Sequence, residues 1–392
     1  MPRTLPFLLA LVPAAAFIGL FFLAPVFVFL SQGVLKDDVG RTMSRTFHQF
    51  LIDKDAAQPT DAVLTAFFAD MRASSRPDMG ALARELDSVM SGLRSMILKA
   101  STNSRRLEVP PADMRGWFRE QDPRWLEGDT WAVLKAQQSR LTWRYLSDTA
   151  PWGAASGADS PTGIQFPDIF LRTIGVALGV AVLCLVVAAP AAYLLVTASG
   201  LAVRIVGACV LISLWTSILA RTLSWIIIFQ REGLINAAAR TLPIFGGPFE
   251  ILGTRTAVVV GMVHVLLPYM IFSLADGLRK IPLEQYRAAT SLGASAAKAV
   301  ALVYLPQLWP AISAGLTIVF TLTVGFYLTP LLLGGPRDQL LGYYTAFFAQ
   351  RSGDWHAAAA LSIWLILLVA GVGLAVALAS RLKQSFRLGR QA

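Results

Sequence analysis

The sequence predicts an all-α polytopic membrane protein, and its composition and its apolar runs carry this prediction. The chain of 392 residues is 55% hydrophobic, its mean hydropathy is +0.58, and 15% of its residues are charged. Soluble domains carry about 25% charged residues, so most of this chain is not suited to water. Several apolar runs reach the roughly 20 residues that a helix needs to cross a bilayer. The two-residue alternation typical of half-buried strands is absent from the sequence.

Six apolar runs qualify as membrane-spanning helices. The first lies where a signal peptide would lie, but the apolar core of a signal peptide has about 7–15 residues. This run has 26 residues, and the only interruptions are the prolines Pro6, Pro13 and Pro25. We therefore interpret residues 1–30 as a retained first transmembrane helix. The six runs are Leu5–Leu30, Ile174–Val196, Ile205–Phe229, Thr256–Leu278, Ala311–Thr329 and Ala357–Ala379.

The charged residues orient these spans. Residues 31–167 contain 17 Lys/Arg and 17 Asp/Glu, whereas the rest of the chain contains 17 Lys/Arg and 7 Asp/Glu, which accounts for the net charge of +10. Cytoplasmic loops carry the Lys/Arg excess, so we expect both termini, including the basic tail 381–392, in the cytoplasm. Residues 31–167 then lie outside. A nucleic-acid-binding protein would instead gather its positive charge on a folded domain. The residues on the cytoplasmic side are Arg3, Arg204, Arg279, Lys280, Arg287, Lys298, Arg381, Lys383, Arg387 and Arg390.

The insert at 31–167 is predicted to be helical. In Pro77–Ser101 and again in 130–146, the core-facing positions recur at spacings of three and four, which is typical of amphipathic helices. We predict an extracytoplasmic domain that docks a binding protein, contacts a partner permease subunit or caps the transport path, and the sequence leaves these three roles open. The positions are Leu82, Leu86, Val89, Met90, Leu93 and Ile97 in the first stretch, and Trp131, Leu134, Gln138, Leu141 and Tyr145 in the second.

A segment of small residues, YRAATSLGASAAKAVALVYLP (286–306), separates the fourth and fifth spans. Pro282 suits the start of a helix, Gly293 suits the left-handed conformation that ends one, and Ser295 can cap the next. The spacing predicts a short helix over Leu283–Leu292, a turn, and a second helix that enters the fifth span. Such a segment would let a protein on the cytoplasmic face move both attached spans.

This segment resembles the cytoplasmic loop signature of ABC importer permeases. In that signature Glu-Ala-Ala is followed after three residues by Gly, and after nine more by Ile-x-Leu-Pro. The matching residues here are Arg287-Ala288-Ala289, Gly293 and Val303-Tyr304-Leu305-Pro306. Arginine in the glutamate position reverses the charge, so an acidic contact is not implied there, and Glu284 is the candidate substitute. Three further stretches, 220–236, 261–282 and 326–344, are similar to the spermidine/putrescine branch of the family.

The resemblance implies the type I ABC importer permease architecture, with 168–380 as a five-helix core and 279–306 as its coupling loop. It further implies that ATP and Mg bind to separate ATPase subunits, which contact residues 284–298. The residues implied in this contact are Glu284, Tyr286, Arg287, Ala288, Ala289, Leu292, Gly293, Leu305 and Pro306.

The resemblance also implies a location and further partners. We expect the chain in the bacterial inner membrane with residues 31–167 in the periplasm. Its partners would be a second permease subunit or a copy of itself, an extracytoplasmic solute-binding protein and the lipid bilayer, but no nucleic acid. The chain has no G-x-x-x-x-G-K-[S/T] motif for phosphate. Its histidines, His48, His264 and His356, are too scattered to predict a metal site, so we expect no catalytic residue, cofactor or metal in this chain.

The resemblance favours a polyamine as the solute, with an amino acid, an opine or another small solute as alternatives. Aromatic faces and carboxylates suit a cation. Arg221 would repel one and would suit a carboxylate instead; an intramembrane arginine by default marks a functional position, although it can also anchor at the headgroups or lock helices together. The candidate path residues are Arg221, Trp225, Glu232, Tyr269 and Tyr327.

Two other classes of membrane protein are alternatives to the importer permease. An ion-coupled secondary transporter would place ionisable groups near the bilayer midplane and would often show repeated halves. Only Arg221 approaches that description, and the sequence shows no repeat. A membrane-anchored sensor would use residues 31–167 to detect a ligand and would continue into a cytoplasmic signalling domain. Both classes are disfavoured against the importer permease.

Overall fold

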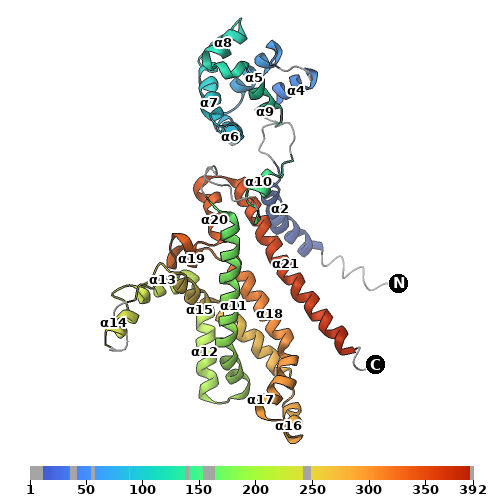
Figure 1. The fold of residues 1–392 in the computed structure, drawn as a ribbon, viewed down its shortest axis with the longest axis vertical. Helices are drawn as coiled ribbons and strands as arrows, with labels where there is room; N and C mark the ends of the chain where they lie inside the picture. The colour runs from blue at the N-terminus through green and yellow to red at the C-terminus, as the bar shows by residue number, and fades with distance from the viewer. Residues whose placement is uncertain are drawn as a thin grey trace. The chain divides into compact units, whose positions relative to one another are not determined.

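The structure is a computed structural model that describes residues 12–35, 42–53, 58–87, 89–136, 141–152, 164–241 and 249–388. Its contacts divide the chain into two compact units, Met1–Tyr145 and Leu146–Ala392. Apart from one bridged pair, Leu35 and Leu141, the described residues fold into helices and turns (Figure 1). The all-α prediction is thereby confirmed. The predicted domain boundaries were drawn where the chain was expected to enter or leave the membrane, and not from contacts between residues. They stay predictions.

The N-terminal unit begins with an apolar helix and continues into a helical domain, which we define as residues 42–136. Val12–Ser31 is long and apolar enough to cross a membrane, and its side chains are exposed to the surroundings. It includes the π turn η1 (Gly19–Leu23) and α2 (Ala24–Ser31). The helical domain consists of α4 (Ser44–Ile52), α5 (Asp61–Ala73), α6 (Arg76–Asp87), α7 (Leu93–Ser104), α8 (Met114–Gln121), the 3-10 turn η2 (Pro123–Leu126) and α9 (Gly128–Ala136).

Aromatic side chains fill the core of the helical domain. Phe67 on α5 lies with its ring centroid 5.1 Å from that of Trp125 and 5.5 Å from that of Trp131. Trp125 is fully buried, and its carbonyl accepts a hydrogen bond of 2.6 Å from the indole Nε1 of Trp131. Aromatic pairs at these distances stabilise a core beyond the area that they bury. The helical domain therefore has a hydrophobic core of its own.

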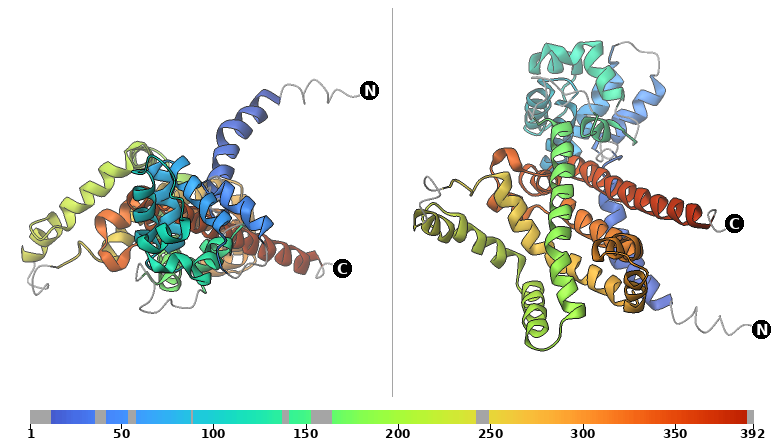
Figure 2. Two further views of the ribbon diagram at one scale, coloured as in Figure 1. Left: turned by 90° about the horizontal axis from the view of Figure 1, so that it is seen from above. Right: turned by 60° about the horizontal axis from the view of Figure 1, so that its bottom comes forward.

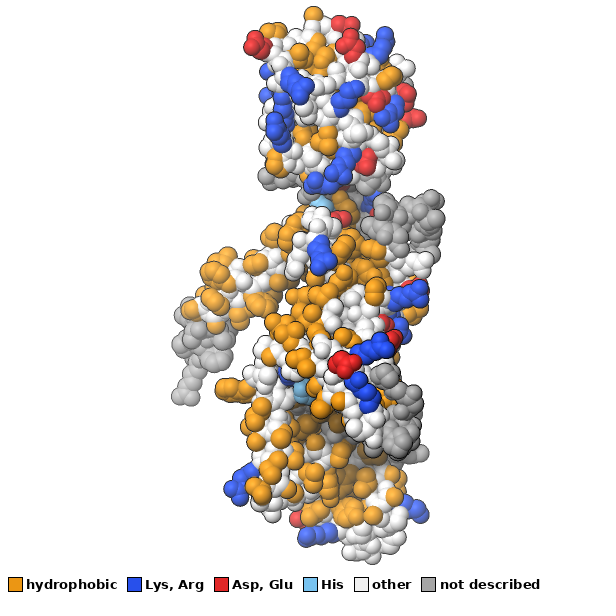
Figure 3. Space-filling model, turned by 90° about the vertical axis from the view of Figure 1, so that its left-hand side faces the viewer, with side chains coloured by type: hydrophobic (Ala, Val, Ile, Leu, Met, Phe, Trp, Pro, Cys, Tyr) orange, Lys and Arg blue, Asp and Glu red, His pale blue; other side chains and the backbone are white. Residues whose placement is uncertain are grey.

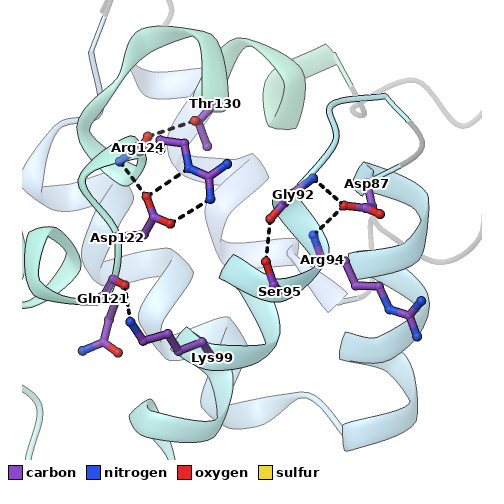
Figure 4. Close-up of polar contacts among 9 residues, drawn as sticks. All are labelled: Asp87, Gly92, Arg94, Ser95, Lys99, Gln121, Asp122, Arg124 and Thr130. Atoms are coloured by element: carbon purple, nitrogen blue, oxygen red, sulfur yellow. Dashed lines mark hydrogen bonds and ion pairs between the residues drawn. The ribbon is translucent and has the colours of Figure 1, made fainter. Parts of the chain in front are cut away.

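The prediction of one helix over Pro77–Ser101 is wrong, because the structure has two, α6 and α7. The chain turns between them at Gly92, whose φ is +91°. Residues other than glycine rarely adopt this backbone conformation. Asp87 at the end of α6 accepts hydrogen bonds from the amides of Gly92 (2.8 Å) and Arg94 (3.0 Å), which lie at the start of α7 (Figure 4). The carboxylate thus satisfies amides that the first turn of a helix leaves unpaired.

The helix predicted over 130–146 is also shorter than expected. The structure has α9, which ends at Ala136, and Gln138 lies outside the described residues. Leu141 forms the antiparallel bridge to Leu35, and the amide of Thr142 donates to the carbonyl of Val34 at 2.9 Å. At Leu141 and Thr142, pairing with the residues that follow the first apolar helix thus takes the place of the predicted helix.

The ion pair between Asp122 and Arg124 joins α8 to η2 (Figure 4). The carboxylate accepts hydrogen bonds from Arg124 Nη2 at 2.8 Å and Nε at 3.1 Å. These hydrogen bonds lower the pKa of Asp122 below its ordinary value of 3.8, so the folded domain binds this proton less readily than the unfolded chain. The stability that results is full at neutral pH and is lost as the pH falls below about 4.

Replacing Asp122 by asparagine is therefore expected to make the helical domain less sensitive to acid. The domain would be produced as residues 32–152, and its urea midpoint would be measured at pH 7 and pH 3 by tryptophan fluorescence. The midpoint should fall between these two pH values by less in Asp122→Asn than in the unaltered segment. Asp129→Asn serves as the control, and an equal effect of both substitutions would contradict the prediction.

In the C-terminal unit three long helices, α11 (Phe166–Thr197), α15 (Arg255–Arg279) and α18 (Leu305–Gly325), pack against one another (Figures 1 and 2). Their sequences are apolar on nearly all sides, as expected of helices that face both protein and lipid. In Figure 3 hydrophobic side chains cover much of this unit, whereas charged side chains are spread over the helical domain. The other elements are α10 (Arg144–Asp148), which crosses the boundary between the units, α12 (Leu201–Trp215), α13 (Ile218–Phe229), α14 (Leu234–Thr241), α16 (Leu283–Ser291), α17 (Ala296–Ala299), η3 (Val300–Tyr304), α19 (Leu328–Leu333), η4 (Pro336–Asp338), α20 (Leu341–Phe347), η5 (Phe348–Ser352) and α21 (Trp355–Leu388).

Small residues bring α15 and α18 into close contact. A Cβ atom added to Gly277 would overlap Ala311 and would lie 2.9 Å from Leu308 Cδ1, and one added to Gly315 would lie 2.6 Å from Met270 Sδ. Ser273 Oγ donates a hydrogen bond of 2.8 Å to the carbonyl of Ala311. Small residues and hydroxyl groups of this kind hold membrane helices together where burial of apolar surface gives no advantage.

The predicted third span is not one straight helix. The structure breaks Ile205–Phe229 at Thr216 and Ser217, and the paired helices Leu201–Trp215 and Ile218–Thr241 meet at 105°. Both residues at the break have extended backbones, and the hydroxyl of Thr216 bonds to the carbonyl of Ile212. Hydropathy gives the length of an apolar run but not the direction of the helix axis, so it cannot reveal such a bend. The described residues thus contain five helices long and apolar enough to span a membrane, or six if the bent pair is one span.

The last two predicted spans differ in their ends. Instead of Ala311–Thr329, the helix runs over Ala296–Gly325 and stops at Phe326, whose backbone is extended, before α19 begins. The predicted span Ala357–Ala379 lies within α21, where Trp355–Ala379 passes the same test of length and apolarity. The fifth span therefore begins directly at the turn that contains Gly293.

Candidate functional site

The coupling loop 279–306 connects α15 to α18. Helix α15 ends at Arg279, and Pro282 precedes the first residue of α16 (Leu283–Ser291). Ser295 caps α17, where its Oγ accepts from the amide of Lys298 at 3.4 Å. The predicted order of short helix, turn and second helix is therefore confirmed.

Gly293 ends α16 in the predicted left-handed conformation, with φ of +87°. Its amide donates to the carbonyl of Thr290 at 3.0 Å, and the amide of Ala294 donates to the carbonyl of Ala289 at 3.1 Å. These two hydrogen bonds make a Schellman motif, in which a left-handed residue satisfies the last carbonyls of a helix. Space is open around the Cα of Gly293, so the backbone conformation and not crowding requires glycine here.

Two side-chain contacts hold α16 against the start of the fifth span. The rings of Tyr286 and Tyr304 meet edge to face with centroids 6.0 Å apart. Gln307 Nε2 donates to Gln285 Oε1 at 2.6 Å. Tyr304 is the last residue of the π turn η3, and α18 begins at the next residue, Leu305. Movement of α16 would therefore pull on α18 through side chains as well as through the backbone turn.

The candidate coupling residues divide between a supporting side and an exposed side. Tyr286, Ala289 and Pro306 are half-buried against the rest of the unit. Leu292, a large apolar residue, has 89% of its surface exposed at the end of α16. The exposed members are Glu284, Arg287, Ala288, Leu292, Gly293 and Leu305. At α16 and its C-cap, the exposed candidate residues thus combine the apolar Ala288 and Leu292 with one acid and one base.

A second cluster forms where α13 packs against α15. Arg221 is 7% exposed, and its Nη1 donates to the carbonyl of Val265 at 3.3 Å. Trp225, one turn further along α13, donates from Nε1 to Nδ1 of His264 at 3.0 Å. Arg221 is therefore an internal residue of this chain rather than one that extends to the headgroups.

The structure does not gather all five predicted path residues into one contact. Tyr269 is 40% exposed on α15 and lies within electrostatic range of Arg221. Tyr327 occupies the break between α18 and α19 and is also 40% exposed. Glu232 follows α13 and forms an exposed ion pair with Arg240 on α14, with Oε2 and Nη2 3.0 Å apart. Arg221, Trp225 and Tyr269 thus share the α13–α15 contact, whereas Glu232 is engaged elsewhere.

His264 was missed as a site residue by reasoning from the sequence. It lies 43 positions after Arg221, and the only signal in its favour was the polarity of a histidine within an apolar run. Ionisable residues within spans are functional candidates by default, and that rule applied to His264 as much as to Arg221.

Comparison with known proteins finds a family model that matches the C-terminal part of the chain. Residues 198–384 match the family model for the binding-protein-dependent transport system inner membrane component. Residues 198–384, just under half of the chain, therefore carry the domain that this family model describes. The match contains the coupling loop and both helices of the Arg221 cluster, so the two candidate sites lie within the shared domain.

Curated relatives of the permease are transport components as well. The spermidine/putrescine transport system permease protein PotB of Escherichia coli (strain K12) is 28% identical over 215 residues, which cover 55% of this chain and 78% of the relative. PotB of Haemophilus influenzae is 32% identical over 161 residues, covering 41% of this chain and 56% of the relative. Among solved structures, a bacterial ABC transporter involved in the import of the polysaccharide alginate aligns with a TM-score of 0.45 at 16% identity, covering 58% of this chain and 86% of that one. The family match and the apolar helices together describe a multi-pass inner-membrane permease component.

Proposed function

We propose that the permease is the membrane-spanning subunit of an ATP-driven importer and that residues 284–298 receive a separate ATPase subunit. The observation that carries this proposal is the glycine-ended α16, which stands between two spans with its small and apolar residues exposed. A helix that exposes Leu292 almost completely at the edge of a membrane domain offers a partner an apolar contact.

The contacts of α16 suggest how ATP would drive transport. ATP and Mg bind to the ATPase subunit, whose closure displaces α16. The Schellman turn at Gly293 and the Gln285–Gln307 hydrogen bond pass this displacement to α18. Because α18 is packed closely on α15, both spans move together as a rigid body. The path for the solute then opens to one side of the membrane at a time.

The proposal includes an orientation and further partners. The excess of Lys and Arg supports an orientation with both termini and α16 in the cytoplasm and residues 31–167 in the periplasm of a bacterial inner membrane. A solute-binding protein delivers the solute from the periplasm, as the family description implies. A second permease subunit, or another copy of this chain, completes the path.

The solute proposed is a small aliphatic amine. Similarity to the PotB permeases supports a polyamine as the first candidate. A second candidate is an amine that also carries a carboxylate, and the buried Arg221 is the observation that favours it. The two candidates differ in one group only, so they can be compared directly.

Co-purification tests the importer proposal. The tagged permease would be isolated from gently solubilised membranes, and the proteins that accompany it identified by mass spectrometry. We expect an ATPase subunit in stoichiometric amount, and its loss when residues 287–293 are replaced by a flexible linker. Arg240→Ala in α14 is the control and should retain the subunit. A permease that purifies alone and transports in proteoliposomes without ATP would be a secondary transporter.

A further inference from the structure

We infer that Arg221 and His264 together form a binding site for a carboxylate on the transported solute. This inference rests on the proposed import function and narrows its substrate class to small amines that also carry a carboxylate. The site lies between α13 and α15, and four observations support it.

The first observation is a buried positive charge whose hydrogen bonding is incomplete. Arg221 is 7% exposed, its Nη1 bonds to one backbone carbonyl, and its Nε has no hydrogen-bond partner among the described residues. A buried charge is tolerated where an opposite charge pairs with it. Three acids of the same unit are already paired with other bases. These ion pairs are Glu232 with Arg240, Asp276 with Lys280, and Asp338 with Arg255.

The second observation is the protonation of His264. Trp225 Nε1 can only donate, so Nδ1 of His264, 3.0 Å away, must accept and carries no proton. The neutral ring therefore bears its hydrogen on Nε2, which is a donor. Arg221 lies within electrostatic range of this ring. The cluster thus offers the guanidinium and a ring N–H to a ligand, and both groups donate.

The third observation concerns the other end of such a ligand. Pro268 lies inside α15, four residues after His264, and has no amide hydrogen to donate to the carbonyl of His264. That carbonyl is available to accept from an ammonium group. The partly exposed rings of Trp225 and Tyr269 are further suitable surfaces for a cation.

The fourth observation is access. Arg221 itself is buried, but His264 and Trp225 are only half-buried and Tyr269 is exposed, so the cluster reaches the surface of the packed helices. The edge of the cluster at His264, Trp225 and Tyr269 is therefore where a small solute would approach. A charge-assisted pair of donors holds a carboxylate more strongly than a neutral acceptor. A second ammonium in the same place would meet the guanidinium and be repelled.

The matched ligands for a test are 4-aminobutanoate and putrescine, which share a four-carbon chain and differ in one terminal group. The full permease would be labelled with ¹⁵N-histidine and placed in nanodiscs of phosphatidylcholine. The chain has 3 histidines, so the His264 signals can be assigned with His264→Gln. We expect Nε2 to be the protonated nitrogen in the free permease. Saturable addition of 4-aminobutanoate should shift this signal, with an affinity at least about tenfold above that for putrescine.

Variants separate the site from its surroundings. Arg221→Gln should weaken the binding of 4-aminobutanoate by about tenfold or more. Arg255 is the first residue of α15 and lies outside the cluster. Arg255→Gln should therefore leave the binding of 4-aminobutanoate unchanged. The comparison of the two ligands on the unaltered chain decides the question even if Arg221→Gln does not insert into membranes.

Three results would overturn the carboxylate site. They are equal or tighter binding of putrescine, the absence of any His264 response to 4-aminobutanoate, and a shift that appears with phosphatidylglycerol nanodiscs before solute is added. The last result would mean that Arg221 and His264 bind the phosphate of a lipid and not a solute carboxylate. Each is distinct from failure of the importer proposal, which depends on the co-purified ATPase subunit and not on the His264 signal.

Discussion

Replacing Gly293 by valine is expected to remove most ATP-coupled uptake while the permease still inserts into the membrane. Gly293 has φ of +87° at the end of α16, and a β-branched residue is strained in that conformation. The cost of roughly 1–2 kcal/mol corresponds to roughly a 5–30-fold loss of the correctly formed turn. Uptake of labelled solute by cells that contain the whole transporter would measure the loss.

The matched control for this prediction is Gly293→Asn. Asparagine is nearly as large as valine but adopts the left-handed conformation at little cost. Nothing lies within 4 Å of a Cβ at this position, so neither side chain is excluded by crowding. We expect Gly293→Asn to retain most of the uptake. Normal uptake in Gly293→Val would show that the Schellman turn does not transmit the ATPase movement.

The sequence predicted the coupling loop well because its structure depends on neighbouring residues. Gly293 and Ser295 act on backbone groups within a few positions, and the chemistry of caps and left-handed turns applies wherever they occur. The same chemistry operates at Gly92, which separates α6 from α7. There the apolar spacing continues across the turn, so periodicity alone joined two helices into one.

Features that depend on distant contacts were not predictable. Leu141 pairs with Leu35, more than a hundred positions away, and the sequence around it still has a helical period. The bend of 105° between α12 and α13 arises at Thr216 and Ser217, where hydropathy is uninformative. The hydrogen bond from Trp225 to His264 also joins two spans, and it becomes visible only once α13 is placed on α15.

The packing of α15 on α18 determines whether movement of α16 reaches both spans. Gly277 and Ala311 touch near the ends of the two helices that adjoin the coupling loop, Ser273 donates to the carbonyl of Ala311, and Gly315 lies against Met270. On α15 these contacts run from Met270 to Gly277, which is about two turns of the helix. A permease with looser packing would bend at this contact instead of rotating its spans together.

Gly277→Ala adds only one methyl group, but we expect it to lower both the stability of the permease and its uptake. A methyl group there overlaps Ala311 and comes to 2.9 Å from Leu308, so the two helices must separate. Overpacking of this kind costs typically 1–3 kcal/mol, which exceeds the gain of roughly 0.5–1 kcal/mol from replacing a helical glycine by alanine. We expect a lower midpoint of thermal unfolding in detergent and a drop in uptake of several-fold.

Gly179→Ala provides the control, because Gly179 is also inside a membrane helix but has nothing within 4 Å of an added Cβ. The gain in helix propensity is the same for both substitutions, so their difference isolates the contact between α15 and α18. Gly179→Ala should keep or slightly raise the unfolding midpoint and leave uptake intact. If Gly277→Ala behaved in the same way, the two spans would not depend on close contact. Coupling would then have to pass through the Tyr286–Tyr304 and Gln285–Gln307 contacts alone.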